Sequence, residues 1–264
     1  MSQTQAAPQI TGRMFLFEKP ELLNREAHGK YGITQTEKPF AFCAKIRAAP
    51  ITASEFISAS RHYPIIFSAQ KAMTPLAVLG VLDDVNLFVD DKGLWEDHAY
   101  VPGYLRRYPF ALATETGGER VAVVFDAAHG SVAENGDNPL FENGEPSAAM
   151  QATIEFCQQY EADRLGADQA MKLLEEFDLV TGQSVQYGAR PDEEQKTFAQ
   201  YFGVEEKRLN ELSDEKFLDL RKKGLLPLIH AQLTSMGNWR SLLERRAKRF
   251  NLTSEQVLDP LRLS

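Results

Sequence analysis

The sequence predicts an α+β protein in which a β-rich N-terminal part precedes a helical C-terminal part. Short β-branched and aromatic runs, broken by Pro, Gly and Asp, fill residues 38–126, and this pattern is typical of strands and turns. Beyond a stretch rich in Gly, Asn, Asp and Pro at 130–146, apolar residues recur at helical spacing. We therefore expect a flexible tail at 1–13, a β-rich domain at 14–146 and a helical domain at 147–264. Fusion of both domains into one unit is the alternative.

The β-rich part is expected to contain short strands and one helix. The helix should begin after Thr52, because Thr52 and Glu55 match a capping box. Gly93 closes a tight turn, since glycine tolerates the positive φ that a hairpin requires. The expected strands are Phe40–Ile46, Pro64–Ser68, Leu76–Val81, Asn86–Val89, Phe110–Ala113 and Val121–Phe125.

The helical part begins with an amphipathic stripe. Met150, Ile154 and Cys157 fall on one helix face. Ser213 is a candidate N-cap and Gly224 a candidate C-terminal stop. Further helices are expected at Asp214–Lys222, Pro227–Met236 and Trp239–Phe250, and the polar residues 181–200 form either a hairpin or an ordered loop.

Composition limits the class of protein. The chain has 264 residues, 43% hydrophobic residues and a net charge of −8, so it can bury a core without disulfides, and a general nucleic-acid surface is disfavoured. Cys43 and Cys157 lie far apart and read as reduced, packed thiols. The N-terminus lacks a secretory signal pattern and no segment is apolar enough to span a membrane. We expect a cytoplasmic protein without membrane insertion, with export by a leaderless route left open.

One motif occurs twice in the β-rich part. Arg61–Phe67 and Arg106–Leu112 share the order basic, basic or His, Tyr, Pro, apolar. Proline fixes φ and donates no ladder hydrogen bond, so each motif should mark the start of a strand. Two such starts suggest related positions in one sheet. The Tyr rings and Arg stems either pack together, or they line a surface that accepts a carboxylate, a phosphate or a peptide.

Aromatic residues concentrate between the two motifs. A half-exposed cluster of Trp95, Tyr100 and Tyr104 beside Arg106 would form a ligand or partner surface, whereas the same cluster buried would be core. The candidate binding residues are Arg61, Tyr63, Trp95, Tyr100, Tyr104, Arg106, Arg107 and Tyr108.

The sequence matches none of the common catalytic motifs. No HExxH, GxSxG, Walker or GxGxxG motif is present, so neither catalytic residues nor a cofactor is assigned. A metal site at His98, Asp126 and His129 is the weaker alternative, since such ligand pairs arise readily by chance. The basic C-terminal helix is either a solvated face or a contact for an acidic partner; its cations are Arg240, Arg245, Arg246, Lys248 and Arg249.

Several of these segments resemble the bacterial SapC family. The resemblance is carried by Tyr63–Phe67, Ala77–Gly80, Asn86–Val89, Trp95, Ala99–Phe110, Pro139–Phe141, Asn143–Ser147 and His230–Met236. It implies a bacterial origin and a link to a surface-layer locus or to genes for outer-membrane uptake receptors. The family brings no settled activity, so no catalytic residue is carried over. It is unrelated to the peptide-transport permease of the same name, which the lack of transmembrane segments excludes here.

The leading hypothesis is a soluble accessory or binding protein with a protein or peptide partner. The resemblance implies a role in the bacterial envelope, surface layer or outer-membrane uptake, without established catalysis. A metal-dependent enzyme that modifies a protein or small molecule is the first alternative. A structural component of the surface layer is the second, and the oligomeric state is open.

Overall fold

The computed structural model describes residues 14–114, 121–189, 194–259 and 261. The chain divides into two compact units, each built from two separate segments. Unit 1 comprises residues up to Pro39 together with Arg106–Ala162, and unit 2 comprises Phe40–Leu105 together with the chain from Asp163 onward. The first Arg-Tyr-Pro motif and the segment that follows it up to Leu105 therefore belong to unit 2, whereas the second motif belongs to unit 1.

Unit 1 is built on small antiparallel sheets. One sheet has the order β1-β7-β6 and another the order β8-β2-β9, while β10 pairs with β11. In the first sheet, Phe110 of β6 lies opposite Phe125 of β7. The elements are β1 (Pro20–Leu22), α1 (Arg25–His28), β2 (Tyr31–Ile33), β6 (Phe110–Thr114), β7 (Val121–Asp126), β8 (Val132–Glu134), β9 (Asn138–Pro139), β10 (Phe141–Glu142) and β11 (Glu145–Pro146).

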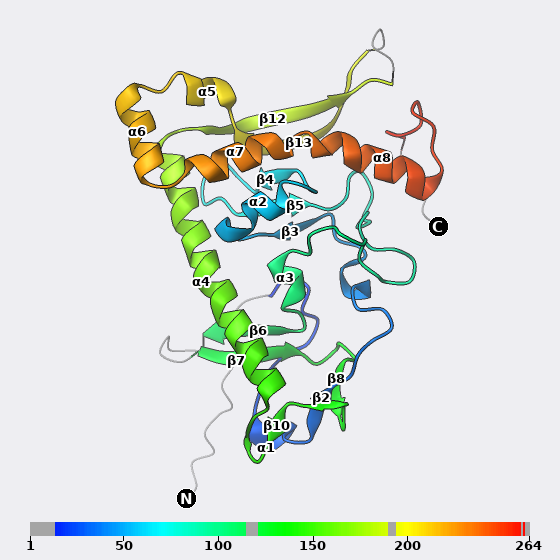
Figure 1. Cartoon of the computed structure of the whole chain (residues 1–264). Coiled ribbons are helices and arrows are strands. Elements are labelled where there is room, and N and C mark those ends of the chain that lie inside the picture. Colours follow the sequence, from blue (N-terminus) through cyan, green and yellow to red (C-terminus); the bar gives the residue numbers. More distant parts are fainter. Residues whose placement is uncertain (1–13, 115–120, 190–193, 260, 262–264) are drawn as a thin grey trace, which may run out of the picture. The chain divides into compact units, whose positions relative to one another are not determined.

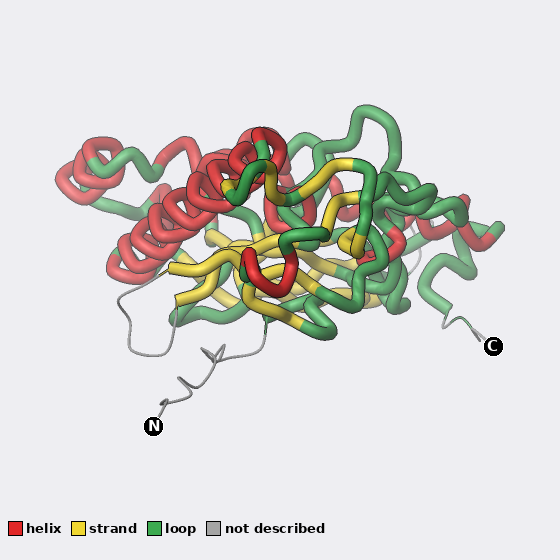
Figure 2. Tube along the Cα trace, turned by 90° about the horizontal axis from the view of Figure 1, so that it is seen from below, coloured by secondary structure: helices red, strands yellow, loops and turns green. Residues whose placement is uncertain are grey.

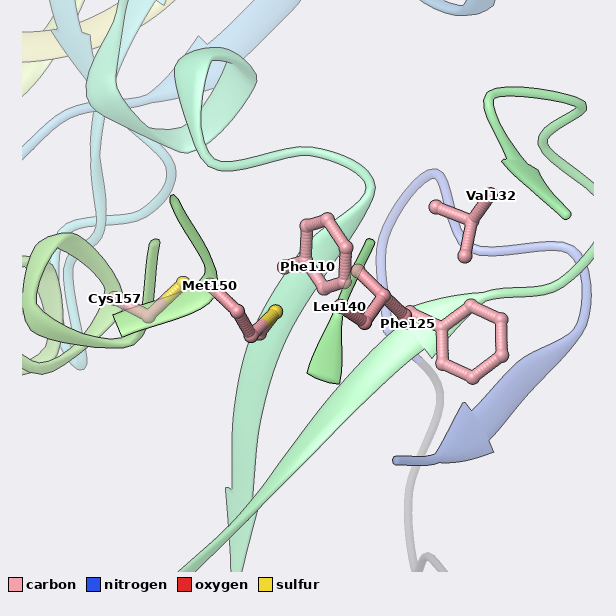
Figure 3. Close-up of a cluster of buried hydrophobic side chains, with 6 residues drawn as sticks. All are labelled: Phe110, Phe125, Val132, Leu140, Met150 and Cys157. Atoms are coloured by element: carbon pink, nitrogen blue, oxygen red, sulfur yellow. The ribbon is translucent and has the colours of Figure 1, made fainter. Parts of the chain in front are cut away.

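The core of unit 1 lies where these strands meet the start of α4 (Ala148–Glu176). Met150 and Cys157, from the expected apolar stripe, point into the core, and both are almost completely buried. Figure 3 shows them together with side chains from β6, β7, β8 and the β9–β10 turn. The members of the cluster are Phe110, Phe125, Val132, Leu140, Met150 and Cys157. Burial raises the pKa of the Cys157 thiol to about 11, so this thiol stays protonated and packs as a small apolar group.

Unit 2 contains a five-stranded antiparallel sheet of order β12-β13-β4-β5-β3 (Figure 1). The strands β12 and β13 form a hairpin paired from Val180↔Val204 to Tyr187↔Lys196, which settles the open choice for residues 181–200. The strands are β3 (Ala48–Pro50), β4 (Ile65–Phe67), β5 (Pro75–Val78), β12 (Val180–Tyr187) and β13 (Lys196–Val204). The helical turns within its first segment are η1 (Ala41–Cys43), η2 (Ala53–Glu55), α2 (Phe56–Ala59) and α3 (Gly103–Arg106), which ends in unit 1.

The C-terminal helices follow the predicted boundaries closely. They are α5 (Glu206–Asn210), α6 (Asp214–Lys222), α7 (Leu226–Ser235) and α8 (Asn238–Phe250). The Ser213 side chain accepts from the Lys216 N–H at the start of α6, and Gly224 has φ +72° just after its end. Figure 2 shows α4 as one long uninterrupted helix. Both capping predictions are confirmed.

Side chains of α7 complete the sheet where β4 and β13 diverge. These strands share one residue pair, Phe202↔Phe67. Beyond it, buried Gln232 donates to the Ile65 carbonyl at 3.1 Å and accepts from the Val204 N–H at 3.2 Å. The Ser235 hydroxyl accepts from the Ile65 N–H at 2.9 Å. The helix thus supplies the partners that a ladder would otherwise provide.

Two expected strands are absent. Phe40–Ile46 folds into η1 and turns, because the Cys43 and Ala44 N–H groups bond to carbonyls three residues back. In Asn86–Val89 the buried Asn86 side chain accepts from the Phe88 N–H at 3.0 Å and donates to the Cys43 carbonyl at 3.2 Å. A side chain here replaces strand pairing, and Val89 makes an isolated bridge to Trp95.

Of the predictions about the two motifs, one is confirmed and one is wrong. The strands β4 and β6 begin directly after Pro64 and Pro109, as expected. Their placement in one sheet is wrong, because β4 belongs to the five-stranded sheet and β6 to the sheet β1-β7-β6. The β-rich and helical order is confirmed as an α+β fold. The expected domain boundary after residue 146 is based on a change in secondary structure and not on contacts, and it stays a prediction.

Candidate functional site

The first motif places its tyrosine inside unit 2. Tyr63 is fully buried, and its hydroxyl donates to the Tyr100 carbonyl. Its ring packs edge-on against Phe88 at 4.7 Å between centroids, and Phe88 stacks with Trp95 at 6.1 Å. Burial raises the pKa of the Tyr63 hydroxyl, so it acts as a neutral donor. Tyr63 and Trp95 are therefore core residues of unit 2.

Glu55 fixes the loop that carries the other two tyrosines. Its buried carboxylate accepts from the Tyr100 hydroxyl at 2.9 Å and from the Gly103 N–H at 2.6 Å. The same carboxylate accepts from the Thr52 N–H at 2.8 Å, as the capping box predicts. Tyr104, one residue beyond Gly103, is 8% exposed. A residue predicted as a helix cap thus also orders the aromatic loop.

The second motif lies in unit 1 and buries its second arginine. Arg107 is 6% exposed. Its guanidinium carbon lies 4.6 Å from the centroid of the Tyr160 ring, and Nη1 lies 3.4 Å from the Glu161 carboxylate. Both partners belong to α4. Arg107 is therefore a packing residue that attaches the motif to this helix.

The Tyr108 hydroxyl is hydrogen-bonded to a buried carboxylate. Its hydroxyl donates to Asp126 at 2.7 Å. The Asp126 carboxylate also accepts from the N–H groups of Glu18 at 3.0 Å, Lys19 at 2.9 Å and Ala128 at 3.1 Å. These four donors hold the start of β1, the end of β7 and the motif together.

The titration of this pair follows from its surroundings. Burial opposes ionisation of Asp126, but the hydrogen bonds from Glu18, Lys19, Tyr108 and Ala128 together outweigh it and lower its pKa. Burial, followed by the bond to Asp126, raises the pKa of Tyr108. The pair is consequently a carboxylate and a neutral hydroxyl, with both carboxylate oxygens already engaged.

The alternative metal ligands do not form a centre within the described residues. His98 is exposed and lies in unit 2, whereas Asp126 and His129 lie in unit 1. His129 Nδ1 lies 2.6 Å from the Ser131 hydroxyl, and burial lowers its pKa. Among the residues that the structure describes, no group of three His, Cys, Asp or Glu side chains could hold a metal ion.

The basic helix α8 is largely neutralised inside unit 2. Arg245 pairs with Glu96 and lies 4.3 Å over the Phe88 ring. Arg246 is completely buried, so its assignment to a solvated or partner-binding face is wrong. Its Nε donates to Asp83 at 2.6 Å and its Nη2 to the Asp259 carbonyl at 2.8 Å.

The other two arginines of α8 are also paired. Arg240 pairs with Glu244 at 3.0 Å and Arg249 with Asp91 at 2.6 Å. Most of the positive charge of α8 therefore has a counter-charge on the same unit, which leaves little for an acidic partner.

Two of the pockets formed by the described residues of unit 2 lie beside these elements. One of about 610 Å³ is lined by Phe88, Trp95, Arg245 and Lys248, among others. The other, of about 820 Å³, lies between the β12–β13 hairpin and α8 and includes Phe198 and Trp239 in its lining. The sequence does not single out Trp239, because an apolar residue at this position of a helix has the same spacing as any other buried residue.

The exposed members of the predicted binding set are few. Arg61 and Arg106 are exposed, and Tyr100 and Tyr108 are half-buried. The Arg106 guanidinium carbon lies 5.1 Å from the centroid of the Phe156 ring of α4. The set divides between the units: Arg61, Tyr63, Trp95, Tyr100 and Tyr104 in unit 2, and Arg106, Arg107 and Tyr108 in unit 1. Its role in binding stays a prediction.

The fold and these clusters define an α+β protein whose buried polar groups chiefly organise loops and helices. The chain belongs to the SapC family: a model of that family matches residues 23–242, which covers most of the chain and parts of both units. No curated protein and no solved structure matches it. Among the helices within the described residues, none has the length and apolar character to cross a membrane.

Proposed function

We propose that this SapC protein is an accessory protein that binds a protein partner in a bacterial envelope, surface-layer or outer-membrane uptake system, without catalysing a reaction. The partner contact is a carboxylate-bearing segment that meets Arg106, which is an exposed residue. The resemblance to the family suggests the envelope-related role, and the position of Arg106 in unit 1 suggests the residue that contacts the partner.

The observation that supports this proposal is the difference between two adjacent arginines. Arg107 is buried against α4, whereas Arg106 is exposed and lies over the Phe156 ring. An arginine held over an aromatic ring presents a planar donor fork with less conformational freedom to lose on binding. Arg106 is therefore the member of the set best placed to meet a carboxylate.

The two buried carboxylates of the described residues that lie nearest the motifs make structural hydrogen bonds. Asp126 and Glu55 each accept bonds that fix the backbone, and no metal-holding group of three is present in the described part of the chain. No specific observation favours the metal-dependent enzyme or the surface-layer component over binding.

The test compares capture by immobilised wild type, Arg106→Ala and Arg106→Lys. Arg221→Ala is the matched control, because Arg221 is also exposed but lies on α6. Proteins retained from a bacterial lysate are quantified by mass spectrometry, and the retained candidate is purified and titrated by calorimetry. Removing a well-placed charged contact should weaken its binding about tenfold or more, with an intermediate loss for Arg106→Lys.

Equal affinity of the purified candidate for wild type and Arg106→Ala would overturn the assignment of Arg106. Retention of no protein above background would overturn the binding function. Arg107 is unsuitable as the test residue, because its loss would also destabilise unit 1.

A further inference from the structure

The strand β12 is an unusually unprotected sheet edge. The five-stranded sheet of unit 2 ends in β12 on one side and β3 on the other, and Figure 1 shows β12 on the outer side of the hairpin. β3 has three residues and ends in Pro50. β12 has eight, Val180–Tyr187, with neither a charge nor a proline. Sheet edges that resist pairing with other chains usually carry such residues.

The direction of the free backbone groups along β12 follows from its pairing. The Leu179 carbonyl accepts from the Glu205 N–H at 2.8 Å, just before the ladder begins. Because backbone direction alternates in an antiparallel pair, Val180, Gly182 and Ser184 turn their N–H and C=O groups away from β13. The bond of Gln70 agrees with this phase, since its side chain, and not β13, donates to the Val180 carbonyl at 3.3 Å.

Within the described residues, the outward backbone groups of Gly182 and Ser184 form no hydrogen bond, and the ladder pairs of both residues lie on β13. The irregularity between Val185 and Gln186 places its extra residue on β13, so the alternation continues along β12 to Gln186. Gly182, Ser184 and Gln186 are all exposed. A row of outward donors and acceptors thus runs along this edge.

We propose that this edge pairs with β12 of a second copy of the chain, antiparallel, with Ser184 on the two-fold axis. Ser184 then faces Ser184 of the other copy, and Gly182 faces Gln186. Exchange of both bonds in each of these pairs gives about six main-chain hydrogen bonds. The resulting sheet is continuous through both copies.

The absence of charge argues for a second copy as the occupant. An uncharged strand offers no means of selecting an acidic or basic peptide, while two-fold pairing opposes no like charges. The pairing also sets Thr181 opposite Tyr187, a β-branched and an aromatic residue that suit a cross-strand pair. Each chain carries a net charge of −8, so association should strengthen as salt screens the repulsion between copies.

The experiment places charges on the proposed axis. Sedimentation velocity measures the association of wild type, Ser184→Lys, Ser184→Glu and an equimolar mixture of the two variants. Gln200→Lys is the matched control: Gln200 is exposed and pairs with Ser184 on β13, so it adds the same charge one strand further from the axis. Circular dichroism melting checks that every variant folds.

We expect a wild-type dimer and a dimeric Gln200→Lys variant. Each Ser184 variant alone should have its dimer dissociation constant raised at least about tenfold, because like charges directly opposite are destabilising. The mixture should recover the dimer, since opposite charges then meet. A monomeric wild type overturns the proposal and leaves the edge to a strand of another protein. A dimer unaffected by the Ser184 charges, or a mixture that stays monomeric, overturns it as well.

Discussion

The two Arg-Tyr-Pro motifs have similar sequences but are used differently. In the first, Tyr63 is fully buried and donates to a main-chain carbonyl, that of Tyr100. In the second, Tyr108 is half-buried and donates to the carboxylate of Asp126. In both, a strand begins immediately after the proline. The motif therefore fixes the start of a strand, while distant segments decide what its polar side chains bind.

The basic positions differ in the same way. Arg107 corresponds to His62 of the first motif, and only Arg107 forms a buried ion pair. Arg61 and Arg106 correspond and are both exposed. Substitutions at equivalent positions should consequently separate what the motif does from what its surroundings do.

The largest difference is expected between Arg107→Ala and His62→Ala. Removing Arg107 breaks the ion pair with Glu161 and leaves a gap beside Tyr160, which should cost about 3 kcal/mol. His62 is half-exposed, so its loss should cost about 1 kcal/mol or less. Urea unfolding monitored by circular dichroism compares the two variants. Equal losses would show that Arg107 has no special structural role.

Asp126→Asn should lower stability by about 2–3 kcal/mol near neutral pH, because an amide leaves at least one buried donor facing another donor. In the folded protein the pKa of Asp126 lies below its ordinary 3.8. The stabilisation that ionised Asp126 provides is therefore complete above its ordinary pKa of 3.8. It is lost as pH falls through the lower pKa of the folded protein.

Urea unfolding of wild type and Asp126→Asn over a range of pH checks this dependence. The stability difference should shrink on acidification. A difference that is unchanged under acid conditions would contradict ionisation of Asp126 as its source.

Substitutions of Tyr108 and Tyr63 should differ less in their effect on the free energy of unfolding. Tyr108→Phe removes a donor to a carboxylate and should cost about 2 kcal/mol, whereas Tyr63→Phe removes a donor to a neutral carbonyl and should cost about 1 kcal/mol. Tyr108→Phe made in the Asp126→Asn background should cost less than in wild type. The free energy of unfolding of wild type, the three single variants and the double variant tests both statements, and strict additivity of Tyr108→Phe and Asp126→Asn would rule out the coupling.

The smallest effects are expected at the corresponding exposed arginines. Arg61→Ala and Arg106→Ala should each change the free energy of unfolding by about 0.5 kcal/mol or less. Thermal melting of the two variants checks this. A large loss at Arg106 would mean that its contact with Phe156 is structural, and would weaken its assignment as a partner contact.

Elements with local signals were predicted well. The helix Asp214–Lys222 has the expected bounds because Ser213 and Gly224 act on their own neighbours. Strand starts at Pro64 and Pro109 depend on the same local constraint. The expected strand Phe40–Ile46 failed because bonds between residues three apart satisfied its backbone first.

The candidate site was harder to predict, because its buried polar groups depend on distant partners. The chain has 37 acidic residues, and nothing local distinguishes Asp126 from those on the surface. Three of its four donors come from Glu18, Lys19 and Tyr108, which are far away in sequence. Likewise, Gln232 lies on α7 but bonds to β4 and β13, which helical spacing alone does not reveal.

The buried cation of α8 has a practical consequence for handling the protein. Arg246 donates to the Val257 and Asp259 carbonyls as well as to Asp83. Trimming the chain before Val257 would remove two acceptors from a guanidinium that water does not reach. Proteolytic shortening that removes Asp259 and Val257 would then act like a core mutation, so carboxypeptidase digestion should meet resistance once it reaches Asp259.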